Sequence, residues 1–165
     1  MLKLTGVLPA LVTPFDAAGQ IDFAAFTAHM TALRAAGVSG WVPCGSSGEY
    51  NLMSDAERDA VLAVVKDFAL PGETLIAGTN APSTAGVIAN TLRAKAMGYD
   101  TVLLAVPFYT KPTQAEIIRH FNAVLDAVML HAQGIPMALG TDGTRYDAFR
   151  LLDAAEATQR LTHGL

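Results

Sequence analysis

The chain has 165 residues, which suits a single domain with a hydrophobic core. Hydrophobic residues make up 52% of the chain and charged residues 16%, a composition that excludes an intrinsically disordered protein. The formal net charge is −4 and no run of Lys or Arg occurs, which argues against a nucleic-acid partner because phosphate binding needs clustered cations.

The apolar runs, the amino terminus and the cysteine count indicate the cellular location and exclude disulfides. No apolar window approaches the roughly 20 residues needed to cross a membrane, and the amino terminus lacks the layout of a signal peptide. We therefore expect a cytoplasmic protein without membrane contact. The single cysteine, Cys44, excludes an internal disulfide and a cysteine-cluster metal site.

The predicted elements alternate between apolar strands and amphipathic helices. Asp22 is a predicted helix N-cap, and the spacings of Ser54 with Glu57 and of Thr113 with Glu116 predict two capping boxes. The helix from Thr113 is expected to be unusually long, since no helix breaker occurs before Gly134. Predicted strands cover residues 6–12, 38–43, 74–77, 101–106 and 136–139, and predicted helices cover 23–36, 55–68, 83–97, 113–133 and 146–163.

The spacing of these elements predicts an α/β fold with a parallel sheet. Strands recur roughly every 30 residues and each is followed by a helix, which is the pattern of repeated βαβ units. Right-handed crossovers place the carboxyl ends of all strands on one side, where α/β proteins bind ligands.

A glycine-flanked loop, Gly45-Ser46-Ser47-Gly48-Glu49, follows the second predicted strand. Its two glycines allow a sharp turn and its hydroxyl and N–H groups could hold a carboxylate or a phosphate. The alternative is a plain tight turn built from small residues. We expect Glu49 to hold the loop by accepting backbone hydrogen bonds, and Cys44 to be a buried small hydrophobe.

Three motifs in order carry a family resemblance: Gly6-Val7-Leu8-Pro9-Ala10-Leu11-Val12-Thr13-Pro14-Phe15, the loop at 45–49, and Pro107-Phe108-Tyr109-Thr110-Lys111-Pro112. Over about residues 4–128 the chain resembles the dihydrodipicolinate synthase / N-acetylneuraminate lyase family. The resemblance implies a class I aldolase or lyase on a (β/α)8 barrel, usually a tetramer of tight dimers. Such enzymes join a lysine to pyruvate or a related 2-oxo acid as a Schiff base. The fold expected here is a partial TIM (β/α)8-type barrel with about five βα units.

The resemblance assigns roles to individual residues. Ser46 matches a hydroxyl in the proton relay, and Ser47 matches the residue that binds the pyruvate carboxylate, with Gly45 and Gly48 beside it. Tyr109 matches a relay tyrosine that reaches across the dimer in many members. No cofactor is expected.

The family's later motifs do not appear in this sequence. These are a Tyr-Asn-x-Pro-type motif on the fifth strand and the Schiff-base lysine on the sixth. Lys66 and Lys95 fall on helices, where we expect them to be solvated. Lys111 is a weak candidate to replace the missing Schiff-base lysine. The predicted function is therefore a class I aldolase or lyase, or alternatively a non-catalytic fragment or chimera that retains a carboxylate-binding loop.

The carboxyl-terminal segment has a different resemblance. Residues 129–143, ending in Gly140-Thr141-Asp142-Gly143, resemble the last strand of amidohydrolases, in which the aspartate is a metal ligand and general base. Asp142 is the matching position, although a turn aspartate is the simpler interpretation because the histidines are isolated from one another. We expect one domain over 1–165, aldolase-like over 1–128 and amidohydrolase-like over 129–165. A metal-dependent hydrolase fragment is the third functional alternative.

The number of predicted units also predicts self-association. A complete barrel needs eight strands, so five βα units leave the first and last strands with unpaired apolar edges. We expect a homo-oligomer, a dimer or larger, with a small 2-oxo acid such as pyruvate as the other partner.

Overall fold

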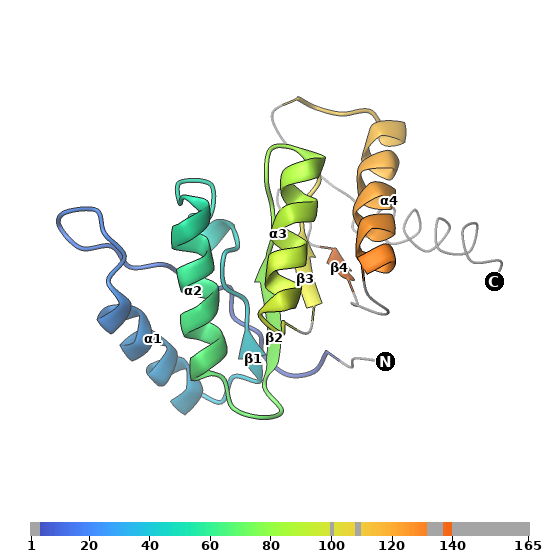
Figure 1. Ribbon diagram of the computed structural model, residues 1–165. Coiled ribbons are helices and arrows are strands. Elements are labelled where there is room, and N and C mark those ends of the chain that lie inside the picture. The colour runs from blue at the N-terminus through green and yellow to red at the C-terminus, as the bar shows by residue number, and fades with distance from the viewer. Residues whose placement is uncertain (1–3, 100, 108–109, 132–136, 140–165) are drawn as a thin grey trace.

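The computed structural model describes residues 4–99, 101–107, 110–131 and 137–139. Four strands form one parallel sheet in the order β1-β2-β3-β4. In Figure 1 the four long helices stand side by side in chain order, with the strands behind them. The strands are β1 (Gly40–Trp41), β2 (Thr74–Gly78), β3 (Thr101–Leu104) and β4 (Met137–Leu139), the helices α1 (Phe23–Ala35), α2 (Asp55–Phe68), α3 (Thr84–Ala96) and α4 (Gln114–His131), and the short 3₁₀-helix η1 covers Ser46–Gly48.

The helices agree closely with the sequence prediction because their end signals are local. The Asp22 carboxylate accepts a hydrogen bond from the Ala25 N–H at 2.9 Å. Ser54 and Glu57 form a complete capping box at the start of α2, and Thr113 and Glu116 form the same pair of contacts before α4. At 18 residues, α4 is the longest described helix, as predicted. The predicted helix 146–163 lies outside the described residues.

The prediction of a regular first strand over 6–12 is wrong in part. This segment makes a single parallel bridge, between Ala10 and Val42, rather than a full strand. Its backbone still runs beside β1, since the Leu11 N–H donates to the Val42 carbonyl at 2.9 Å and the Val42 N–H donates to the Pro9 carbonyl at 3.1 Å. Proline lacks an N–H and fixes φ, so Pro9 interrupts the ladder.

The second predicted strand is also shorter than expected. β1 covers two residues instead of the predicted 38–43, because the chain turns at Pro43 and at Cys44, whose φ is 58°. A non-glycine residue in the left-handed region ends an extended strand. This early turn brings the 45–49 loop to the carboxyl end of the sheet.

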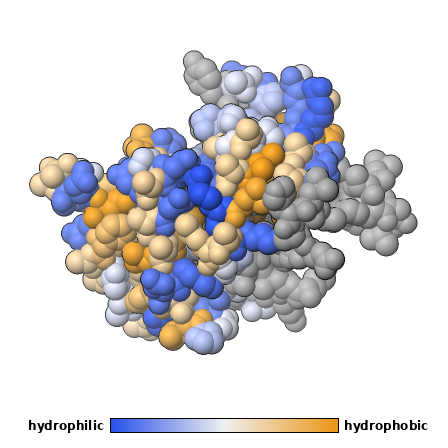
Figure 2. Space-filling model, in the orientation of Figure 1, coloured by the Kyte–Doolittle hydropathy of each residue, from blue (hydrophilic) through white to orange (hydrophobic). Residues whose placement is uncertain are grey.

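The core lies between the helices and the sheet. Its largest buried side chains come from α1, α2, β1, β3 and the first segment: Trp41, Phe26, Leu11, Met30, Leu104, Val61 and Val65. On the face seen in Figure 2, hydrophobic and hydrophilic residues are interspersed. Among the described helices, none combines the length and the apolar character that a membrane span requires.

Candidate functional site

The 45–49 loop forms a compact turn held by its own backbone. The Gly48 N–H donates to the Gly45 carbonyl and the Glu49 N–H donates to the Ser46 carbonyl, each at 3.0 Å. Gly45 and Gly48 are buried, whereas the side chains of Ser46 and Ser47 are exposed. The loop thus turns its two hydroxyl-bearing residues toward solvent and its glycines toward the protein.

A buried threonine fastens this loop to the first segment of the chain. The Thr13 hydroxyl donates to the Gly48 carbonyl at 2.8 Å, and Thr13 is only 5% exposed. A Cβ atom added to Gly48 would lie 2.9 Å from the Leu11 carbonyl oxygen, so this close approach requires glycine. The Thr-Pro-Phe motif therefore contributes to the site through Thr13, a role that sequence reasoning missed.

The other glycine of the loop has no such requirement. Gly45 has φ −80° and ψ −177°, an extended conformation open to any residue. The nearest atom to an added Cβ would be the Leu103 Cδ2 at 3.9 Å, an ordinary contact. Of the two loop glycines, only Gly48 is fixed by the surrounding structure.

The end of β2 packs directly against the turn before the loop. The Gly78 N–H donates to the Pro43 carbonyl at 2.9 Å. A Cβ on Gly78 would lie 1.9 Å from the Cys44 carbonyl oxygen, which leaves no room for any side chain. Sequence analysis placed Gly78 just beyond a strand and assigned it no role.

Cys44 behaves as the predicted buried hydrophobe. It is 1% exposed, and burial raises the pKa of its thiol to about 12. Its Sγ lies 3.9 Å from the Arg58 carbonyl oxygen. A thiol that stays protonated is a poor nucleophile, so Cys44 is a structural residue.

Asn80 joins the carboxyl ends of two strands. Its side-chain oxygen accepts a hydrogen bond from the Ala105 N–H, just after β3, at 2.6 Å. Its backbone carbonyl accepts from the Arg58 guanidinium at 2.8 Å and from the Asn90 amide at 3.3 Å. The sequence signal for Asn80 is a polar residue two positions after a buried strand.

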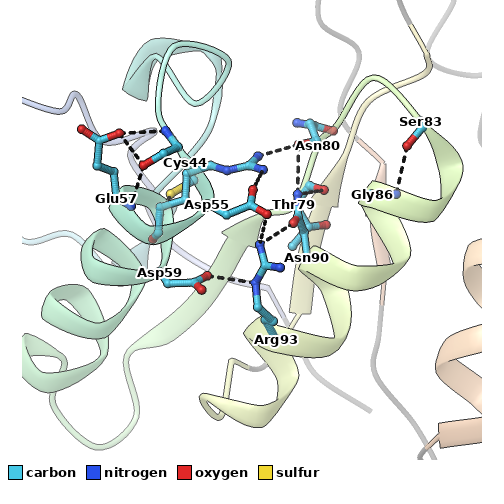
Figure 3. A network of polar contacts seen from close by, with 12 residues as sticks. Cys44, Asp55, Glu57, Asp59, Thr79, Asn80, Ser83, Gly86, Asn90 and Arg93 are labelled. Atoms are coloured by element: carbon cyan, nitrogen blue, oxygen red, sulfur yellow. Dashed lines mark hydrogen bonds and ion pairs between the residues drawn. The ribbon is translucent and has the colours of Figure 1, made fainter.

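A wider polar network supports Asn80 from the helices (Figure 3). Arg58 on α2 pairs with Asp55 at 2.8 Å, and Arg93 on α3 pairs with Asp59 at 3.1 Å and with Asp55 at 3.3 Å. These contacts link α2 and α3 outside the sheet. The hydrogen bond from Arg58 to the Asn80 carbonyl anchors the network to the chain just after β2.

Glu49 does not hold the loop through hydrogen bonds to the backbone, contrary to the prediction. Glu49 occupies the left-handed conformation at the end of η1, with φ 57°. Within the described residues no hydrogen bond holds its exposed carboxylate, so the expectation that it fastens the loop is not supported. Thr13 and the loop backbone do this instead.

Among the described residues, the three lysines show no sign of a Schiff-base environment beside the 45–49 loop. Lys66 is exposed as predicted, and its ammonium donates to the Gly98 carbonyl at 2.9 Å. The prediction for Lys95 is wrong, because its Nζ is buried without a hydrogen-bond partner in the described part of the chain. Lys95 lies in the last turn of α3, at the amino ends of the strands and opposite the loop. Lys111 is exposed.

His120, on α4, is a buried histidine. It is 5% exposed, and its Nδ1 lies 2.8 Å from the Thr84 hydroxyl. Burial lowers the pKa of its imidazole. It borders a cavity of about 410 Å³ between the amino ends of α3 and α4 that does not include the 45–49 loop.

Two predicted site residues, Tyr109 and Asp142, lie outside the described residues, as does Phe108. Within the described ranges, no cluster of three or more His, Cys, Asp and Glu side chains could hold a metal ion. The structure therefore brings together Gly45, Ser46, Ser47 and Gly48 of the predicted site, and adds Thr13, Gly78 and Asn80.

A parallel sheet flanked by helices, with its candidate loop at the carboxyl ends of the strands, defines an α/β protein of the (β/α)-barrel class. Comparison with known proteins identifies the family within this class. The model of the Dihydrodipicolinate synthetase family matches residues 3–137. The chain belongs to this family, which confirms the predicted family and the partial TIM-barrel fold.

Individual relatives agree. The chain is 36% identical over 152 residues to the 4-hydroxy-tetrahydrodipicolinate synthase of Synechococcus sp. strain CC9311, a match covering 90% of this chain and 50% of that protein. It is 42% identical over 128 residues to the synthase of Sorangium cellulosum strain So ce56, covering 77% and 42%. The chain spans about half the length of these curated relatives.

Solved structures show the same relationship. The 4-hydroxy-tetrahydrodipicolinate synthase of Methylacidiphilum fumariolicum SolV superposes with a TM-score of 0.75 at 31% identity, covering 83% of this chain and 44% of that one. The chloride-inhibited dihydrodipicolinate synthase of Acinetobacter baumannii, complexed with pyruvate, gives a TM-score of 0.77 at 31% identity, covering 83% and 45%.

The amidohydrolase resemblance receives no support from these matches. The family match continues to residue 137 and so includes the first part of the segment 129–165. The Gly-Thr-Asp motif with Asp142 lies beyond that match and outside the described residues.

Proposed function

We propose that this chain binds the carboxylate of pyruvate, or of a related 2-oxo acid, at the 45–49 loop, as part of a dihydrodipicolinate synthase-like lyase site. The observation that carries this proposal is the loop's geometry. Ser47 is exposed, and neither its N–H nor its hydroxyl has a hydrogen-bond partner among the described residues. Two adjacent donors on a braced loop suit a carboxylate, which accepts several hydrogen bonds.

The rigidity of the loop supports binding. Thr13, Gly48 and Gly78 hold the turn from two sides, so little conformational entropy is lost when a ligand binds. Family membership supports the ligand class, since a structurally similar synthase is complexed with pyruvate. Ser46 is proposed for the proton relay beside the bound acid, with Tyr109 as its partner.

We further propose that the chain binds the acid without forming a Schiff base. A Schiff-base lysine needs a desolvated pocket that favours its neutral amine. Lys111 is exposed, and Lys66 donates its hydrogen bond to the Gly98 carbonyl, beyond the carboxyl end of α3. The Lys95 ammonium is buried at the opposite end of the sheet from the loop.

Calorimetric or NMR titration with pyruvate tests the binding step. The Ser47→Ala variant removes one donor to a charged acceptor and should weaken binding about ten- to a hundredfold. Ser39→Ala is the matched control, because Ser39 precedes β1 at the other end of the same strand. Equal affinity in wild type and Ser47→Ala, or no binding at all, would reject the loop as the site.

Borohydride reduction in the presence of pyruvate tests the chemistry. Intact-protein mass spectrometry measures whether a covalent adduct forms. We expect pyruvate to bind without forming one. A stoichiometric adduct would show instead that a lysine of this chain acts as nucleophile, and peptide mapping would identify it.

A cytoplasmic location remains a prediction from the sequence.

A further inference from the structure

A side-chain hydrogen bond joins the amino ends of α3 and α4, which pack against each other. The Nδ1 atom of His120, in the second turn of α4, lies 2.8 Å from the hydroxyl of Thr84, the first residue of α3. Both helices start at the carboxyl ends of the strands, where the 45–49 loop also lies. This contact therefore ties two elements together at the end of the sheet that carries the candidate site.

The imidazole of His120 is buried, and only one of its nitrogens has a partner. The residue is 5% exposed, and within the described part of the chain its Nε2 makes no hydrogen bond. A neutral ring can keep its proton on Nδ1 and donate it to Thr84, so that no N–H is left unpaired. A second proton must go to Nε2, where it finds no acceptor. The geometry thus accommodates the neutral ring and opposes the charged one.

The described surroundings supply no free anion that could offset a charge on His120. Residues 80–92 contain no ionisable side chain, nor do the strands β2 and β3. The Glu116 carboxylate on α4 already accepts two hydrogen bonds at the start of that helix, at 2.7 and 2.8 Å. Arg119 on α4 and Lys111 before it are cations, so they disfavour a further positive charge nearby.

We propose that His120 is a pH-sensitive latch, which ties the amino end of α4 to Thr84 of α3 while it is neutral and releases it when it gains a proton. The cavity of about 410 Å³ that His120 borders gives the charged ring a short path to water. Release therefore needs a local movement of the first turns of α4 rather than unfolding of the whole chain.

The direction of the pH effect follows from burial. Burial lowers the pKa of the His120 imidazole below its ordinary value of 6.5 in the folded chain. The stabilisation by the latch is thus complete above pH 6.5 and is lost as the pH falls below that value. The connection from β3 to α4 should loosen in mild acid, and this inference does not depend on the 2-oxo acid proposal.

Amide hydrogen exchange of the full chain at pH 7.5 and 5.5, corrected for intrinsic exchange rates, tests the latch. Exchange in the first two turns of α4 should rise by up to about tenfold at the lower pH, because a released histidine is about ten to one protonated there. His120→Asn keeps a polar side chain that cannot titrate and should lose this response. His29→Asn, at a half-buried position on α1, is the matched control and should keep it.

Thr84→Val tests the hydrogen bond separately from the proton. Valine keeps the shape of threonine but removes the hydroxyl, so the first turns of α4 should exchange faster even at pH 7.5. Thr31→Val, at an exposed position on α1, should leave exchange in α4 unchanged. An NMR titration of the folded chain should show that His120 takes up its proton below pH 6.5.

An equal pH response in wild type and His120→Asn would overturn the proposal, because other groups would then cause it. An increase in exchange that is equal over the whole chain would also overturn it, since it would show global unfolding instead of local release. So would a His120 that titrates at or above pH 6.5, or a Thr84→Val variant with wild-type exchange at pH 7.5. Those last two measurements decide the question even if His120→Asn does not fold.

Discussion

Replacing Thr13 with valine tests whether the first segment braces the 45–49 loop. Valine keeps the volume and branching of threonine but removes the hydroxyl that donates to the Gly48 carbonyl at 2.8 Å. Because both residues are buried, the carbonyl loses this partner where water does not easily replace it. Leaving a buried acceptor unpaired costs about 1–3 kcal/mol, so we expect the free energy of unfolding to fall by about 2 kcal/mol.

Urea unfolding measures this loss, and a second threonine provides the control. The Thr27 hydroxyl also donates at 2.8 Å, to the Phe23 carbonyl, but on the exposed surface of α1. Thr27→Val should therefore change the free energy of unfolding by no more than about 0.5 kcal/mol. Pyruvate affinity should weaken in Thr13→Val only. Equal destabilisation by the two substitutions would refute the bracing role.

Three further outcomes follow from the geometry. Gly78→Ala places a methyl group against the Cys44 carbonyl and should lower the free energy of unfolding by about 2–3 kcal/mol in urea, whereas Gly45→Ala should be nearly neutral; the reverse order would contradict the close approach. Cys44, whose pKa is raised to about 12, should resist iodoacetamide at pH 8 until the protein unfolds; stoichiometric labelling of the native chain would show it accessible. Hydrogen bonds from Arg34 and Trp41 lower the pKa of Glu73 to about 2. The stabilisation of the fold by ionised Glu73 is complete above 4.5, the ordinary pKa of a glutamate, and is lost as the pH falls toward 2. Wild type should thus lose about 1–2 kcal/mol more than Glu73→Gln between those pH values in urea titrations, after allowance for solvent screening; parallel losses would disprove the effect.

The sequence alone determined the helices, because their signals lie within one turn of each end. The capping contacts of Asp22, Ser54 and Thr113 join residues three positions apart. Such contacts form whatever the rest of the chain does, so spacing in the sequence predicts them. The family, the parallel sheet and the position of the 45–49 loop were likewise predicted from ordered motifs and from the alternation of strands and helices.

Strand extent could not be predicted in the same way. The apolar runs at 6–12 and 38–43 have strand composition, but only two residues of the second form a regular strand and the first makes a single bridge. A strand exists only where a neighbour pairs with it, so its ends depend on Pro9 and on the turn at Cys44.

Only the tertiary structure decided which residues support the loop. Thr13 and Gly48 are 35 positions apart, and the contact of Asn80 with Ala105 spans 25. Gly48 and Gly78 must be glycines because backbone from distant segments approaches them, whereas Gly45 has open space. Sequence spacing contains no information about such approaches, since folding alone brings these segments together.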